Sequence, residues 1–346
     1  MIISTIRSLV LCATLIGHAA GAAPPAYPNT GGIGADASAD RWYKQCLGVA
    51  TAAPPAADLA ADGPAPAACD AQALYYDAKN RPGASQADWR QVRLCAFARQ
   101  DQGVLMMLYA NGFGVARQPE LALKYACGLG GARAEMSGRV DHLLALRSGA
   151  EPAPFDLCDD ITSGYMQGVC AAIDERRHNK ARGVQLDGLT KGWPPQHLDA
   201  FERARRALAA FADARGRNET DASGTARAAM AIEAESAETA RFARDIAGFE
   251  RGQLPRYDAA RLAAADAQLN LLYRQLMARA VTPEHTITPD TTVTGNDLKL
   301  TQRAWLGYRD ALAAFGAARY PQVAPASWKT LATLRRVEQL RQLSRE

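Results

Sequence analysis

The sequence predicts an all-α protein, in which a disulfide-stapled helical-repeat unit is followed by one or more antiparallel helical hairpin modules. From position 89 onward apolar residues recur at helical spacing, and no segment alternates apolar and polar residues as a half-buried strand would. Aromatic residues make up only 7% of the chain, so most apolar side chains are small and suit close helix packing. An even number of cysteines follows an apolar leader, which favours an exported, disulfide-bonded protein.

Residues 1–22 have the features of a secretory signal peptide. Arg7 provides the basic region, residues 8–17 provide a short apolar region, and Ala20-Gly21-Ala22 fits a cleavage site. The apolar run is too short to span a bilayer, and no later run is long enough to do so. We therefore expect a periplasmic or secreted protein without a membrane span.

The cysteines that follow the leader are candidates for disulfide bonds. They are Cys46, Cys69, Cys95, Cys127, Cys158 and Cys170. The sequence does not select one pairing, and we prefer sequential pairing because each loop then stays within one unit. No C-x-x-C or C-x-x-H spacing and no nucleotide-binding motif is present, so we predict neither a metal nor a cofactor.

The formal charge of +4 is unevenly distributed along the chain. Residues 1–150 carry a net charge of +2, residues 151–250 carry −4, and residues 251–346 carry +6. In the last segment basic and acidic residues are interspersed, which indicates solvated helix faces and not a nucleic-acid site. We therefore predict a protein partner and no nucleic acid.

Residues 23–76 are rich in Ala, Pro, Gly and Asp and predict a flexible linker, with one short ordered piece at residues 40–47. Residues 77–150 predict helices joined by tight turns. In the turn after Tyr109, Asn111 precedes two glycines, Gly112 and Gly114, which supply the backbone angles needed to reverse the chain.

This turn and its flanking helices resemble the Sel-like repeat, a tetratricopeptide-like helix–turn–helix unit. The matching residues are Leu108, Tyr109, Asn111, Gly112, Gly114, Val115, Ala122 and Ala126. A single unit cannot bury its own apolar face, because repeat arrays need about three units to be stable. We therefore expect disulfide bonds, neighbouring helices or both to complete it, and a Cys95–Cys127 bridge between adjacent helices is attractive.

Residues 151–256 predict further helices. An apolar stripe runs along residues 201–214, with charged side chains on the opposite face. Residues 159–162 offer caps for a helix that begins near Ser163.

Residues 257–346 predict three helices, at about 257–280, 298–319 and 327–344, and the first two should share a polar seam. Acid, amide and phenol side chains recur on one face of the first helix, and amide, indole and guanidinium groups recur on one face of the second. In an antiparallel pair we expect three contacts: Asp266 with Arg309, Asn270 with Trp305, and Tyr273 with Gln302. The alternative is that these side chains contact a ligand or partner.

These helices resemble the LprI family of lysozyme inhibitors. The family pattern has an Asp, a Leu-Asn pair and a Tyr, then a Gln-Arg-x-Trp-x-x-Tyr-Arg-Asp run, then a Thr-x-x-Arg-x-x-x-Leu end. The matching residues are Asp266, Leu269, Asn270, Tyr273, Gln302, Arg303, Trp305, Tyr308, Arg309, Asp310, Thr333, Arg336 and Leu340. The resemblance implies an all-helical exported module that binds a protein, which is lysozyme in characterised relatives.

Residues 151–256 have two interpretations. The segment "SGYMQGVCAA" resembles the start of the same module, and "FERARRALAAFADARGRNE" echoes its second helix, with Ala204 and Leu208 in place of the aromatic anchors. The region is then a degenerate second module. The alternative is an unrelated helical spacer.

We predict an exported, non-enzymatic, lysozyme-inhibitor-like protein that binds lysozyme or another envelope or extracellular protein. One alternative is a periplasmic scaffold that assembles partners through the repeat unit. Another is a cell-wall-acting enzyme with paired carboxylates, for which Glu233, Glu235 and Glu238 are the candidates. No hydrolase nucleophile motif accompanies them, which disfavours the enzyme.

Overall fold

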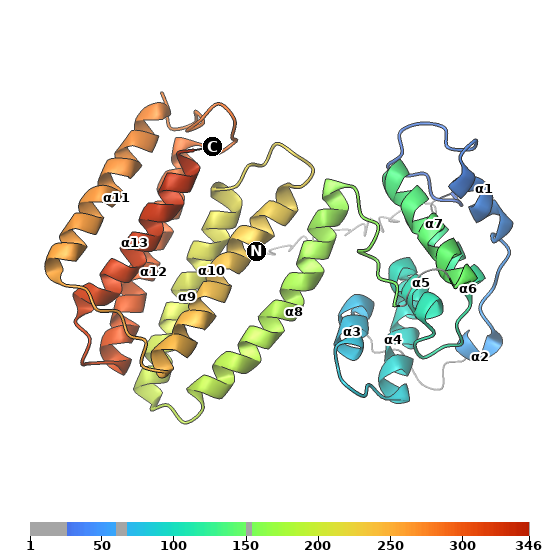
Figure 1. The fold of residues 1–346 in the computed structure, drawn as a ribbon, viewed down its shortest axis with the longest axis horizontal. Helices are drawn as coiled ribbons and strands as arrows, with labels where there is room; N and C mark the ends of the chain where they lie inside the picture. Colours follow the sequence, from blue (N-terminus) through green and yellow to red (C-terminus); the bar gives the residue numbers. More distant parts are fainter. Residues whose placement is uncertain (1–25, 60–67, 150–153, 346) are drawn as a thin grey trace, which may run out of the picture.

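The computed structural model describes residues 26–59, 68–149 and 154–345, which form thirteen helices (Figure 1). Within these ranges there is no β-strand, only one isolated antiparallel bridge between Thr286 and Thr294. The all-α prediction is therefore confirmed. No helix in the described ranges is long and apolar enough to cross a bilayer. The predicted signal peptide lies outside the described residues.

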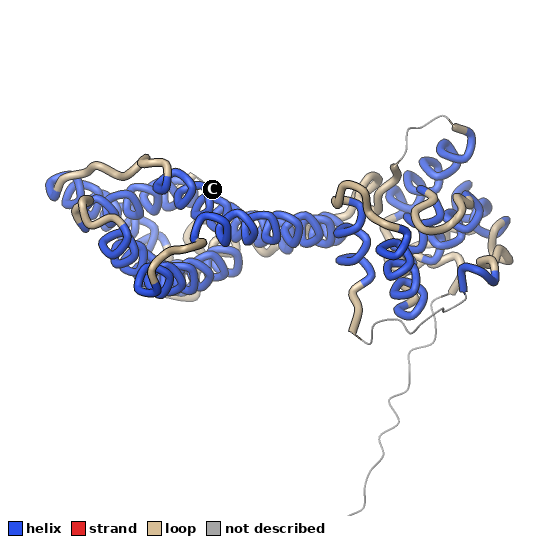
Figure 2. Tube along the Cα trace, turned by 90° about the horizontal axis from the view of Figure 1, so that it is seen from below, coloured by secondary structure: helices blue, strands red, loops and turns tan. Residues whose placement is uncertain are grey.

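Two hydrophobic cores divide the fold into an N-terminal and a C-terminal body. Helix α8 (Gly164–Thr190) contributes to both, because Met166 and Ile173 lie in the first core and Leu186 lies in the second. The two bodies are joined through a narrow helical region (Figure 2). The helices after α8 therefore form a body of their own.

The N-terminal body contains seven helices before α8. They are α1 (Arg41–Gly48), α2 (Ala56–Leu59), α3 (Ala71–Lys79), α4 (Gln86–Arg99), α5 (Gln102–Asn111), α6 (Pro119–Gly128) and α7 (Arg133–Ser148). Helices α5 and α6 pack against each other, as do α3 and α4. Gly112 and Gly114 have φ angles of +73° and +68°, so the predicted role of these glycines in the turn is confirmed. The assignment of this hairpin to the Sel-like repeat stays a prediction.

Residues 26–59 pack on this body, which differs from the linker predicted there. Only the short ordered piece predicted at residues 40–47 is confirmed, because it coincides with α1. The backbone N–H of Asn29 donates to the carbonyl of Cys127 at 2.8 Å, and Ala37 is buried. Asp58 is also buried and accepts a hydrogen bond from the Tyr109 hydroxyl at 2.9 Å. These contacts tie the segment down despite its low apolar content. Residues 60–67 lie outside the described part of the chain.

Three disulfide bonds staple the N-terminal body to itself and to the start of α8. They are Cys46–Cys127, Cys69–Cys95 and Cys158–Cys170. Only the last agrees with sequential pairing, and the predicted Cys46–Cys69 and Cys95–Cys127 bridges are wrong. The reason is tertiary packing, because α1 lies against α6 and α7 while α3 lies against α4. The bonds indicate an oxidising compartment.

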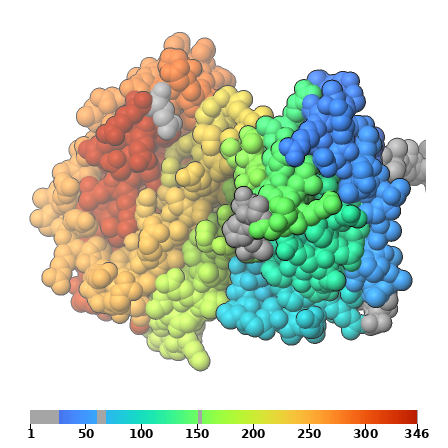
Figure 3. Space-filling model, turned by 45° about the vertical axis from the view of Figure 1, so that its right-hand side comes forward, coloured from blue at the N-terminus to red at the C-terminus, as the bar shows by residue number. Residues whose placement is uncertain are grey.

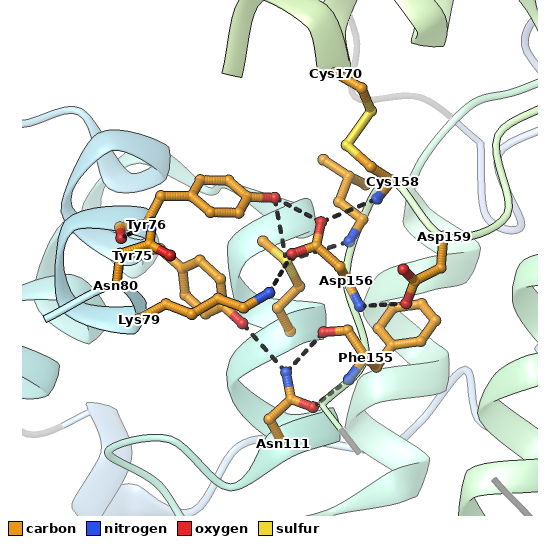
Figure 4. Close-up of polar contacts among 12 residues, drawn as sticks. Tyr75, Tyr76, Lys79, Asn80, Asn111, Phe155, Asp156, Cys158, Asp159 and Cys170 are labelled. Carbon is orange, nitrogen blue, oxygen red and sulfur yellow. Dashed lines mark hydrogen bonds and ion pairs between the residues drawn. A yellow bond between two sulfur atoms is a disulfide. The ribbon is translucent and has the colours of Figure 1, made fainter. Parts of the chain in front are cut away.

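A strap formed by residues 154–160 connects the repeat-like hairpin to α8 (Figure 4). The side-chain amide of Asn111 donates to the carbonyl of Phe155 at 2.8 Å and accepts from its N–H at 2.7 Å. Asp156 accepts hydrogen bonds from the Tyr76 hydroxyl at 2.8 Å and from Lys79 Nζ at 2.6 Å. Burial alone would raise the pKa of Asp156, but these donors outweigh it and hold the pKa below its ordinary value. The strap therefore fixes where α8 begins.

Ser163 is the N-cap of α8 and accepts from the N–H of Met166. The predicted helix start is confirmed, but the predicted caps within residues 159–162 are wrong. The carboxylate of Asp160 instead lies 2.9 Å from Nδ1 of His142. The carboxylate of Asp159 accepts a hydrogen bond from the backbone N–H of Asp156 in the strap.

The C-terminal body contains five further helices, which together with α8 form two three-helix units. They are α9 (Pro195–Asn218), α10 (Arg227–Glu250), α11 (Ala259–Arg279), α12 (Gly295–Arg319) and α13 (Pro325–Leu343). In each unit the first helix packs on the third, so α8 lies on α10 and α11 lies on α13. Helices α8 and α11 therefore lie at the two outer sides of this body (Figure 1).

The two units meet where α9 and α12 pack antiparallel. The rings of Phe211 and Tyr308 stack with centroids 5.8 Å apart, and Phe201 approaches Phe315 at 5.7 Å. The hydroxyl of Thr301 donates to the carbonyl of residue 214 at 3.2 Å. The partner of α12 is thus a helix about a hundred residues earlier in the chain.

Removing the Cys46–Cys127 bond by paired alanine substitution is expected to destabilise the N-terminal body more than removing the Cys158–Cys170 bond. The first bond links cysteines that are 81 residues apart in the sequence, and the second links cysteines that are 12 residues apart. Loop-closure entropy gives about 4–5 kcal/mol for the longer loop and about 3 kcal/mol for the shorter one. Urea unfolding of both variants measures the difference, and an equal or reversed order would contradict this account.

Candidate functional site

A groove between α11 and α12 brings together most of the residues predicted for the seam. Its volume is about 400 Å³. The residues that line it are Asp266, Leu269, Asn270, Tyr273, Lys299, Gln302, Arg303, Leu306 and Arg309. In the space-filling view the orange and red C-terminal segments lie on the side away from the blue N-terminal segments (Figure 3). The predicted side chains therefore surround an open space.

The predicted ion pair between Asp266 and Arg309 is wrong. Asp266 accepts instead from the Thr333 hydroxyl of α13 at 3.3 Å. Arg309 donates to Asp310 at 3.0 Å, and its guanidinium lies 5.3 Å from the centre of the Trp305 ring. The reason is that α11 packs mainly on α13 and α12 mainly on α9, so that a groove lies between the two predicted partners.

Among the described residues, several hydrogen-bond donors that line the groove have no protein partner. Within the described part of the chain, neither Lys299 nor Arg303 makes an ion pair, and both are exposed, as is Asn270. Partial burial raises the pKa of Tyr273 above its ordinary value, although Arg303 lowers it. The phenol therefore remains protonated at neutral pH and can donate a hydrogen bond.

The aromatic residues of the predicted motif are part of the core. Trp305 is 1% exposed, and Tyr308 is buried against Phe211 of α9. Burial raises the pKa of Tyr308, so its phenol stays neutral. These two side chains pack in the core and hold α12 in place.

Arg336 of α13 is fully buried, and its guanidinium forms hydrogen bonds with three other side chains. Its terminal nitrogens donate to the carboxylate of Glu219 at 2.8 and 2.5 Å. Its Nε donates to the amide oxygen of Gln302 at 2.9 Å. Gln302 also lines the groove. A buried ion pair between α13 and the end of α9 thus orients one side chain of the groove wall.

A second buried carboxylate, Glu238 of α10, completes this network. It accepts from Arg215 at 2.6 Å and from the amide of Gln339 at 2.9 Å. Gln339 in turn accepts from Arg336 at 3.3 Å. The network therefore joins α9, α10, α12 and α13. The sequence predicted other roles for Arg336 and Glu238, and it did not single out Glu219, Arg215 or Gln339. A buried arginine needs an acidic partner, but the sequence does not show which acid that is.

Comparison with known protein families assigns the last three helices. Residues 256–344 match the family model described as lysozyme inhibitor LprI. They form an LprI-type segment. The match spans roughly the last quarter of the chain and includes every residue that lines the groove. No curated protein and no solved structure matches the chain.

The match confirms the resemblance that the motif predicted for the LprI segment. Of the ten residues predicted for it, six line the groove and the others do not. Those six are Asp266, Asn270, Tyr273, Gln302, Arg303 and Arg309. Trp305, Tyr308 and Arg336 are buried, and Asp310 is exposed beside Arg309.

A larger cavity of about 630 Å³ lies in the N-terminal body, outside the LprI segment, between α5, α7 and the start of α8. Arg139 is its buried basic residue, and it is already paired with Glu135 at 3.1 Å. Glu135 also accepts from the Ser163 hydroxyl at 2.8 Å. The charged groups in its wall are therefore used to hold helices together.

Replacing Arg336 with Met is expected to destabilise the C-terminal body by about 3–5 kcal/mol, because it leaves the Glu219 carboxylate buried without its main partner. The double variant Arg336→Met/Glu219→Gln should be less destabilised than the sum of the two single variants. A double-mutant cycle from urea unfolding measures this coupling. Additive effects would mean that the two residues do not depend on each other.

Proposed function

We propose that this is an exported, non-catalytic protein-binding protein of the lysozyme-inhibitor type, that its target is lysozyme, and that it binds through the α11–α12 groove. The observation that supports this most is the division of the LprI motif between core and surface. Trp305, Tyr308 and Arg336 serve packing. The groove-lining residues Asn270 and Arg303 have no packing role and remain exposed, as a contact surface requires.

The chemistry of the groove supports binding and not catalysis. Its lining includes one carboxylate, Asp266, which is engaged by Thr333. Hydrolysis of a glycosidic bond by the usual route needs two facing carboxylates, one acting as acid and the other as base or nucleophile. Glu238, a candidate for that role from the sequence, is buried beneath Arg215 and Gln339.

The compartment fits this function. The three disulfide bonds are of the kind that persists in oxidising surroundings such as the periplasm or the extracellular space. Lysozyme acts in the same surroundings. A periplasmic or secreted location would therefore place the protein where its proposed target is found.

We also propose that α8–α10 is a divergent copy of the LprI segment, related to it by an approximate twofold axis near the Phe211–Tyr308 stack. A hollow of about 160 Å³ between α8 and α9 takes the place of the groove. Four residues of α8 line it at the spacing i, i+3, i+4, i+7, which is the spacing of Asp266, Leu269, Asn270 and Tyr273 in the groove. The four are Asn179, Arg182, Gly183 and Leu186.

The third helices support the same correspondence. Thr239 and Phe242 of α10 line the hollow and are three residues apart. Thr333 and Arg336 of α13 have the same spacing, and they contact the groove residues Asp266 and Gln302. In this alignment Leu208 and Phe211 of α9 correspond to Trp305 and Tyr308 of α12. The sequence pattern alone places Ala204 and Leu208 at those two positions.

The hollow is smaller than the groove, and Arg182 lies in its wall. Arg182 forms an ion pair with Glu175 and donates to the side chain of Asn179 at 2.8 Å. In the groove the corresponding position is Leu269. We therefore assign partner binding to the α11–α12 groove alone.

Filling the groove with a neutral side chain is expected to weaken lysozyme binding without unfolding the protein. Asn270→Trp places a bulky ring at an exposed groove position, and we expect the affinity to fall about tenfold or more. The control is Leu271→Trp, because Leu271 is 50% exposed on the same helix and does not line the groove. Calorimetric titration and a muramidase assay measure the two variants.

The wild-type protein should bind and inhibit lysozyme in these assays, and Leu271→Trp should behave like it. Absence of binding by the wild-type protein at both low and moderate salt would contradict the proposed target. Equal loss of affinity in both variants would contradict the proposed surface.

A further inference from the structure

We propose that the α11–α12 groove recognises an acidic segment of its protein partner, in which an aspartate or glutamate carboxylate lies next to an apolar side chain. This inference rests on the proposed use of the groove for binding. It adds the chemistry of the contact, which neither the family match nor the motif specifies.

The charge of the groove favours a carboxylate. Lys299 and Arg303 both lie on α12, one turn apart, exposed and without an ionic partner in the described part of the chain. Asp266 is the only acidic residue of the lining, and it is half-buried and bonded to Thr333. A carboxylate entering the groove therefore meets two available cations, whereas an ammonium group would meet their repulsion.

The neutral donors of the groove favour the same ligand. The Tyr273 phenol stays protonated, the side-chain amide of Asn270 is exposed, and Gln302 uses its oxygen to accept from Arg336. Because the oxygen of Gln302 faces Arg336, its amide nitrogen remains free to donate, and the buried network fixes the orientation of the amide. Donors of fixed geometry beside a guanidinium are the arrangement that binds carboxylates well.

The apolar part of the lining sets the second requirement. Leu306 is 38% exposed and lies one turn after Arg303, and the buried Leu269 also lines the groove. A ligand that buries an apolar side chain against these leucines gains more than an isolated acetate-like ion would. We therefore expect a peptide segment, and not a free anion, to be the ligand.

This chemistry also restricts how a basic enzyme such as lysozyme could bind. The LprI segment is itself rich in basic residues, so the two proteins repel each other at long range. Contact through the groove then has to involve an acidic site on an otherwise basic partner.

The test uses three capped peptides with the cores Glu-Leu-Asp, Gln-Leu-Asn and Lys-Leu-Lys, each labelled at one end with the same neutral fluorophore. Each is titrated by fluorescence polarisation into the full mature chain. The acidic peptide should bind at least about tenfold more tightly than the amide peptide, and its affinity should fall as salt is added. The basic peptide should bind least. Equal binding of all three, or no binding of any, would overturn the inference.

Two charge-reversal variants locate the site. Arg303→Glu should weaken binding of the acidic peptide about tenfold or more. The control is Arg206→Glu, because Arg206 is the exposed position of α9 that corresponds to Arg303 under the proposed duplication. It should leave binding unchanged, and retained binding by Arg303→Glu would contradict the inference.

The same variants separate this inference from the lysozyme target. If the acidic peptide binds in an Arg303-dependent manner but lysozyme does not bind, the groove chemistry stands and the target is wrong. If lysozyme binds the Arg303→Glu protein as well as the wild type, while the peptides fail to bind, the target stands and the groove chemistry is wrong.

Discussion

The buried guanidinium of Arg336 imposes the main constraint on the C-terminal body. A charge with no exposure to water must be paired, and Glu219 at the end of α9 provides the carboxylate. This pairing, together with the contacts of Gln339 and Glu238, holds α13 against α9 and α10 in one register. Because Nε of Arg336 also holds Gln302, the same constraint reaches the wall of the groove. The LprI segment therefore depends on helices outside it for both its core and its groove.

The two bodies of the protein reach stability by different means. The N-terminal body is built from short helices, and a single pair of such helices buries little apolar surface. The disulfide bonds, and the hydrogen bonds that Asn111 and Asp156 make in the strap, add the stability that this packing lacks. The five helices that follow α8 are long, have an aromatic core around Phe315 and Trp328, and contain no cysteine. The helix α8 is shared between the two cores, so the first body provides a fixed start for the second.

Much of the fold could be predicted from local patterns in the sequence, because helical periodicity and capping act over a few residues. The last three helices lie within a few residues of their predicted limits, and Gly112 and Gly114 adopt the predicted conformations. Long-range partners could not be predicted in this way. The expected Asp266–Arg309 pair assumed that helices adjacent in sequence pack together, but the aromatic face of α9 covers α12 instead. Likewise, Cys46 pairs with a residue 81 positions away.

We propose that the partner covers the α11–α12 groove. Hydroxyl-radical footprinting of the full chain, alone and saturated with lysozyme, tests it directly because it reports the exposure of individual side chains. Leu306 and Tyr273 should become protected in the complex, while Tyr165, which is 73% exposed in the N-terminal body, should stay as reactive as in the free protein. Protection of Tyr165 without protection of Leu306 would contradict the account.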